Sequence, residues 1–150
     1  MGLDSYAAIP TVENGKRLLS CDLPGRVVSV KSYTGYDGKP QVEVRRVADG
    51  FEKVPEMIGG MCSGTGSDGS FRGKAYYDLV EQLTGFSLFE EELPPPVVQK
   101  MALMLRASVN GQQGPPSAWC QDQRTADDVE ALACFFEACS KMGYSVISWY

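Results

Sequence analysis

The chain has 150 residues, 43% of them hydrophobic and 22% charged, a composition typical of one globular domain spanning residues 1–150. Its net charge of −5, with 14 Lys and Arg scattered among 19 Asp and Glu, does not provide the positive footprint of a nucleic-acid-binding protein. The absence of histidine excludes Ser-His-Asp and Cys-His catalysis and imidazole-dependent metal sites within one chain.

The N-terminal segment, up to about residue 26, carries turn signals at Asn14-Gly15 and Pro24-Gly25 and is predicted to be irregular. It lacks the basic and apolar regions of a signal peptide, and no apolar run reaches the roughly 20 residues that span a bilayer. The five cysteines form no CxxC pair, which argues against a zinc ribbon, and their odd number without a secretion signal argues against a disulfide framework. We therefore expect a cytoplasmic protein with neither a membrane partner nor a bound metal.

Two segments, 27–33 and 41–47, alternate apolar and polar residues and flank a turn-rich connection that contains Asp37-Gly38. This pattern predicts a β-hairpin over about residues 27–47. Three helices are predicted next: residues 72–83 ending before Gly85, a helix that begins at the prolines 94–96, and residues 125–142 with Thr125 as N-cap. The sequence YSVISWY closes the chain and predicts a strand over about residues 144–149.

The third predicted helix carries the widest apolar face, so we expect it at the centre of the domain. Its main stripe consists of Val129, Leu132, Phe136 and Cys139. Cys134 and Cys139 are interpreted as small core residues. A hairpin, three helices and a returning strand indicate an α+β fold. We expect a small, mainly antiparallel sheet, made of the hairpin at about 27–47 and the C-terminal strand at about 144–149, packed on about three helices.

The segment before the first predicted helix, GGMCSGTGSDGSFRG at residues 59–73, contains six glycines. It includes a GxGxxG match at residues 64–69, but no βαβ unit surrounds the match as a dinucleotide site requires. The P-loop spacing fails by one residue at 69–75, and Ala75 stands where the magnesium-binding hydroxyl would be. Both nucleotide signatures are incomplete, and no cofactor is predicted.

A looser anion site remains open in this loop, because backbone amides at a helix N-terminus attract negative charge. The candidate residues, which would hold a small anionic ligand with backbone amides and two cations, are Gly64, Gly66, Ser70, Arg72 and Lys74. The same composition is also typical of an ordinary surface loop. Cys62, in a GxCxG sequence without a histidine base, is either a reactive thiol or an inert loop thiol.

Three blocks of the chain occur together: MGLDSYA at the start, GGMCSGTGSDGSFRGKAYYDLVEQLTGFSLFEEELPP in the middle and VEALACFFEACSKMGYSVISWY at the end. In this combination the chain resembles an uncharacterised family of small bacterial proteins of the actinobacterial type. The resemblance implies a bacterial, cytoplasmic protein and brings no activity, cofactor or site residues.

The sequence favours a non-catalytic binding or interaction module, because it has no histidine, no metal-ligand spacing and no intact catalytic motif. One alternative is a homo-oligomeric structural or partner-binding protein, in which the strand SVISWY lies at a sheet edge and pairs with another chain. A further alternative is a histidine-independent enzyme that uses carboxylates, Tyr or Cys62.

Overall fold

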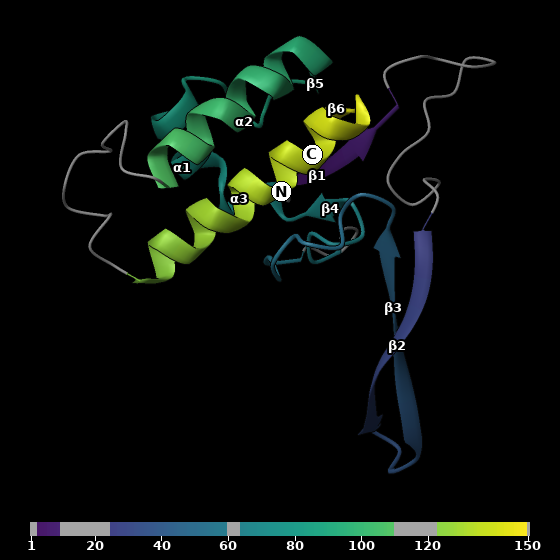
Figure 1. Cartoon of the computed structure of the whole chain (residues 1–150). Coiled ribbons are helices and arrows are strands. Elements are labelled where there is room, and N and C mark those ends of the chain that lie inside the picture. Colours follow the sequence, from purple (N-terminus) through teal and green to yellow (C-terminus); the bar gives the residue numbers. More distant parts are fainter. Residues whose placement is uncertain (1–2, 10–24, 60–63, 110–122, 150) are drawn as a thin grey trace.

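The computed structural model describes residues 3–9, 25–59, 64–109 and 123–149 (Figure 1). In chain order the elements are β1 (Asp4–Ala8), β2 (Gly25–Thr34), β3 (Pro40–Ala48), β4 (Ser70–Phe71), the 3₁₀ turn η2 (Gly73–Ala75), α1 (Tyr77–Thr84), β5 (Glu92–Leu93), α2 (Pro95–Val109), α3 (Gln123–Met142) and β6 (Ser145–Trp149). The predicted α+β class is confirmed. None of the described helices combines the length and the apolar content that crossing a membrane requires.

The main sheet has four antiparallel strands in the order β4-β1-β6-β5. Its two central strands pair from Asp4 opposite Trp149 to Ala8 opposite Ser145. The C-terminal strand is confirmed, but the predictions that it joins the hairpin and lies at a sheet edge are wrong, because β1 and β5 flank it. The prediction of an irregular N-terminal segment missed β1, whose sequence DSYAA lacks the β-branched residues that mark strands.

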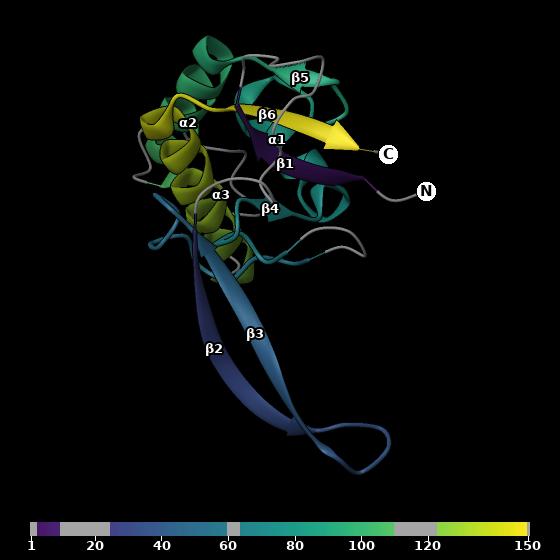
Figure 2. The ribbon, with the colours of Figure 1, turned by 90° about the vertical axis from the view of Figure 1, so that its right-hand side faces the viewer.

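β2 and β3 are the predicted hairpin, and they form a sheet of their own that projects from the rest of the molecule (Figures 1 and 2). We call residues 25–48 the arm and the remaining described residues the body. The N–H of Gly38 donates a 3.0 Å hydrogen bond to the carbonyl of Gly35 at the tip, with Gly38 at φ +75° as the Asp37-Gly38 pair predicted. Tyr36 is fully exposed at this tip.

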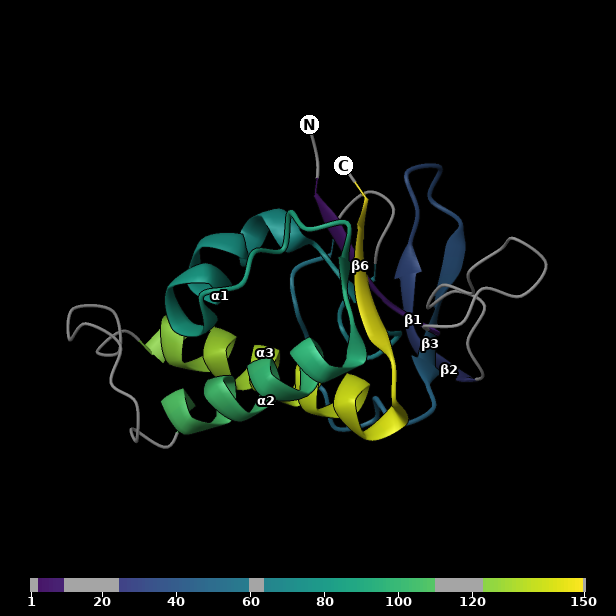
Figure 3. The same ribbon diagram turned by 90° about the horizontal axis from the view of Figure 1, so that it is seen from above.

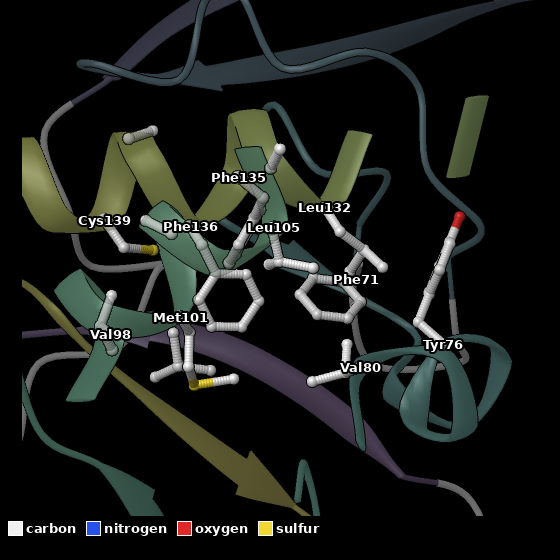
Figure 4. Packing of buried hydrophobic residues seen from close by; sticks show 14 of the residues in the cluster. Phe71, Tyr76, Val80, Val98, Met101, Leu105, Leu132, Phe135, Phe136 and Cys139 are labelled. Atoms are coloured by element: carbon white, nitrogen blue, oxygen red, sulfur yellow. The ribbon is translucent and has the colours of Figure 1, made fainter. Parts of the chain in front are cut away.

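α2 and α3 lie along each other and cover β6 of the main sheet (Figure 3). The predicted stripe of α3 is confirmed, because Val129, Leu132, Phe136 and Cys139 are all buried. Phe135 extends this core: its ring lies edge-on to Phe71, with the two centroids 4.7 Å apart (Figure 4). Aromatic pairs in this geometry contribute about 0.5–1.5 kcal/mol beyond their burial.

Two predicted helix starts are wrong. α1 begins at Tyr77 rather than at residue 72, because Arg72 is extended and Gly73–Ala75 form a 3₁₀ turn. α3 begins at Gln123, so Thr125 lies inside its first turn rather than at the N-cap. The predicted stop at Gly85 is confirmed, since this residue adopts the left-handed conformation at φ +76° after α1.

Candidate functional site

The glycine-rich loop folds around Ser70, which is buried in β4. The Ser70 Oγ accepts a 2.7 Å hydrogen bond from the N–H of Gly64 and donates a 3.0 Å bond to Asp68 Oδ1. The N–H of Ser70 donates to the same Asp68 oxygen at 3.1 Å, and the N–H of Gly66 donates to the Ser70 carbonyl at 2.7 Å. Asp68 therefore places a carboxylate of the chain itself among the donors that the predicted anion would need.

Arg72 and Lys74 lie beyond this loop, on the segment that leads to α1. The N–H of Arg72 donates to the carbonyl of Ile58 at 2.8 Å, and the N–H of Lys74 donates to the carbonyl of Leu3 at 3.0 Å. The predicted set is therefore divided: Gly64, Gly66 and Ser70 share one hydrogen-bonded loop, whereas Arg72 and Lys74 do not belong to it. The anion site stays a prediction.

Two glycines of the loop are required by its own folding. Gly66 adopts φ +99°, and a Cβ there would lie 2.9 Å from Cγ of Met57. A Cβ at Gly64 would lie 1.6 Å from Oδ2 of Asp68. Side chains larger than hydrogen would therefore collide with the loop or with its neighbours.

The loop also holds the base of the arm. The N–H of Ala48, a fully buried residue, donates a 2.8 Å hydrogen bond to the carbonyl of Ser67. The carbonyl of Gly69 accepts a 2.8 Å hydrogen bond from the N–H of Ala7 in β1. Residues 64–70 thus connect the arm to the main sheet, and we call them the socket.

The orientation of Ala48 fixes the outer side of β3. Its N–H points to Ser67 and therefore away from β2. β3 pairs without interruption, and N–H groups alternate sides along a strand, so those of Val42, Val44 and Arg46 point to the same outer side. Among the described residues no other strand joins this edge, and Ser67 bonds to its end at Ala48.

A charged cluster that the sequence analysis missed joins α2 to α3. Arg106 of α2 donates from Nη1 to Glu130 Oε2 at 3.0 Å and from Nε to Glu137 Oε1 at 3.0 Å. The hydrogen bonds to Glu137 raise the pKa of the Arg106 guanidinium further above its ordinary value, so it is always charged. The sequence pattern that could have indicated this cluster is the spacing of Glu130, Cys134 and Glu137, which places them on one face of a helix.

The described thiols lie on α3. Cys134 is half-buried, with its Sγ 3.5 Å from Nη2 of Arg106 and 3.5 Å from Oε1 of Glu130. Burial raises the pKa of Cys134 despite the opposing effect of Arg106, and burial also raises the pKa of the core residue Cys139. Both thiols are protonated at neutral pH and are weak nucleophiles. Cys62, the candidate reactive thiol, lies outside the described residues.

A pocket of about 560 Å³ opens beside this cluster, between α3 and the segment that follows the arm. Its lining includes Glu52, Lys53, Val54, Arg106, Ala138 and Met142. Because Arg106 is already paired with two carboxylates and the other charges have both signs, the lining favours no ligand of one charge. In the part of the chain that the structure describes, no three His, Cys, Asp or Glu residues gather as metal ligands.

No family model, curated protein or solved structure matches this chain. The function is therefore inferred from the geometry of the arm, the socket and the cluster.

Proposed function

We propose that the chain is a non-catalytic interaction module whose arm binds an extended strand of a protein partner. The observation that carries this proposal is that the arm is a two-stranded sheet that stands clear of the body (Figure 2). A two-stranded ribbon alone is marginally stable in water, and six of the residues in this one are valine. A strand added at its edge completes a hydrogen-bonded ladder and covers apolar surface.

The base of the arm is built to display it in a fixed position. Both backbone groups of Ala48 form hydrogen bonds. Its N–H donates to Ser67, and its carbonyl accepts a 3.0 Å bond from the N–H of Phe51. Phe51 is fully buried, and its ring centroid lies 5.4 Å from that of Phe135. This anchoring reduces the ordering cost of binding, since the end of the ribbon is already held in place.

The outer edge of β3 supplies the binding groups. The N–H groups of Val42, Val44 and Arg46 point outward and form the repeating pattern that an added strand requires. Strand addition takes its affinity from such main-chain bonds and its specificity from the side chains at alternate positions. Cys134 offers no nucleophile beside this module, because burial raises its pKa and keeps the thiol protonated.

The test removes one outward donor without disturbing the pairing of β2 with β3. Val44→Pro deletes an outward N–H, which an edge strand tolerates, whereas Val44→Ala keeps this N–H and serves as the matched control. A displayed library of random peptides is selected on the wild-type chain, and the enriched peptides are then measured against both variants. We expect peptides that bind the wild type and Val44→Ala but lose binding to Val44→Pro.

Thermal melts of both variants show whether the body remains folded. Peptides that bind Val44→Pro as well as they bind Val44→Ala would contradict strand addition at β3. A selection that yields no peptide dependent on the arm would contradict the proposed function as a whole.

A further inference from the structure

We infer that the partner strand is β3 of a second copy of this chain, paired antiparallel about a two-fold axis at Val44. This inference rests on the proposed function, in which the arm binds by edge pairing, and it identifies the strand that is bound.

The two edges of the arm are not equivalent. β2 contains a bulge between Ser29 and Lys31, so Val30 has no opposite residue in β3. A bulge twists a strand and disrupts the ladder, which protects that edge from further pairing. β3 is regular from Pro40 to Ala48, and its outer edge can accept a strand up to Arg46, before the bond from Ala48 to Ser67.

Symmetry leaves few registers for two β3 strands. A two-fold axis normal to a sheet preserves its faces, so the axis of an antiparallel pair passes midway between one residue and the same residue of the other copy. Each register is named by that residue. An axis at Glu43, Arg45 or Arg46 would place two like charges directly opposite each other. An axis at Val42 would place Lys39 opposite Arg45 of the partner subunit.

An axis at Val44 satisfies the charges of β3. Val44 then lies opposite Val44 of the partner subunit, and Glu43 lies opposite Arg45 of the partner subunit on both sides of the axis. Within each arm Glu43 is already opposite Lys31. In the sheet of four strands that two paired arms form, the position of Glu43 therefore lies between Lys31 and Arg45 of the partner subunit. Opposite charges at directly opposed positions stabilise an antiparallel pair, and like charges destabilise it.

The backbone of β3 fits the same register. Val42 lies opposite Arg46 of the partner subunit, so every outward N–H of the central segment meets an outward group of the other copy. The ladder ends at this pair, because Ser67 already bonds the outward N–H of Ala48 and occupies the outer side of β3 there. Pro40 has no N–H, so it leaves no unpaired donor beyond Val42.

A second copy is favoured over another occupant because β3 is complementary to itself in both charge and hydrogen bonding. The arm as a whole carries five Lys and Arg against two Asp and Glu, whereas the entire chain has a net charge of −5. Two basic arms repel each other in the registers centred on Val42, Arg45 and Arg46, so the attraction in the register at Val44 comes from Glu43. The same basic character makes nucleic acid the occupant that the experiment must separate from a second copy.

Sedimentation velocity of the full chain over a wide concentration range tests the inference. The wild type is expected to dimerise. In Arg45→Glu, residue 45 of each copy places a carboxylate opposite Glu43 of the other copy, so the dissociation constant is expected to rise at least about tenfold. Arg46→Glu is the matched control, because it makes the same charge change and lies opposite Val42 of the partner subunit. Arg45 and Arg46 are both opposite valines in their own arm, so this control is expected to keep the dimer.

Glu43→Arg is expected to weaken the dimer as Arg45→Glu does. An equimolar mixture of these two variants places Arg opposite Glu at one position and Arg45 opposite Glu43 at the other, so association returns as a heterodimer. Recovery on mixing also shows that both variants are folded.

Equal losses in Arg45→Glu and Arg46→Glu, or no recovery on mixing, would overturn the register. A wild type that is monomeric at every concentration would overturn the second copy, and would leave the proposed function in place if selected peptides still require the outward N–H of Val44. A dimer that survives Val44→Pro would overturn pairing through β3. An association that nuclease treatment removes would assign the arm to nucleic acid instead.

Discussion

The N–H of Ala48, at the base of the arm, donates a 2.8 Å hydrogen bond to the carbonyl of Ser67 in the glycine-rich loop. This contact links the two features of the chain that look least related in sequence, a projecting hairpin and a loop with nucleotide-like glycine spacing. It gives the loop a structural role as the socket of the arm. It also identifies which side of β3 is free to pair.

Gly66 is expected to be the socket position most sensitive to substitution. Gly66→Ala forces an L-residue to φ +99° and brings its Cβ to 2.9 Å from Met57 Cγ, so we expect a loss of about 2–4 kcal/mol in the free energy of unfolding. Gly85→Ala is the control: it has a similar φ of +76° and no atom within 4 Å of its Cβ, and should lose about 1–2 kcal/mol. Urea denaturation measures both, and equal losses would show that the contact with Met57 does not matter.

The predicted anion site has a direct test in solution. Because the amides of Gly64, Gly66 and Ser70 already donate within the loop, inorganic phosphate is expected to leave the Tm of the wild type unchanged. A rise in Tm that disappears in Arg72→Ala would instead support an anion held between the loop and α1.

Arg106 is expected to join α2 to α3 with a moderate contribution. Arg106→Met leaves Glu130 and Glu137 without their common cation and should lower the free energy of unfolding by about 1–2 kcal/mol at low salt. The loss stays moderate because the two glutamate side chains are 42% and 44% exposed, and it should shrink as salt screens the charges. Lys141→Met, an exposed control on the same helix, should change stability by less than about 0.5 kcal/mol. A loss in Arg106→Met that is independent of salt would point to packing rather than charge.

Local patterns predicted the parts of the fold that depend on neighbouring residues. The alternation on both sides of Asp37-Gly38 predicted the hairpin, and the stripe from Val129 to Cys139 predicted the buried face of α3. Both depend on periodicity, which a single segment carries.

The parts that were missed depend on residues far apart in the chain. β1 is a strand because Asp4–Ala8 lies between β4 and β6, and its own sequence contains no β-branched residue. The socket could not be predicted, since its glycines look identical whether their amides bind an anion or, as for Gly64 and Gly66, bond to Ser70. The Arg106 cluster required the packing of α2 on α3 to be known.

Alkaline pH is expected to destabilise the protein through Cys139. Burial raises the pKa of this thiol in the folded state, so the folded state keeps its proton while the unfolded chain loses it above about pH 8.5. Its contribution is complete below that pH, and above it the free energy of unfolding should fall by about 1.4 kcal/mol per pH unit for this one group. Cys139→Ala should therefore show a shallower decline between neutral and alkaline pH in urea denaturation. Parallel declines in the two proteins would contradict this assignment.

Disulfide trapping tests the symmetric pairing of β3 most directly. In the proposed register residue 44 of each copy lies about 5.5 Å from its counterpart between Cα atoms, within the range that a disulfide spans. Val44→Cys under mild oxidation is predicted to give a dimer linked through residue 44, as identified by mass spectrometry of the linked peptide. Gln41→Cys alone should give no such link, because its two copies lie about 20 Å apart, whereas a mixture of Gln41→Cys and Val47→Cys should link. Links through residue 41 that form as readily as links through residue 44, or no link through residue 44, would contradict the proposed dimer.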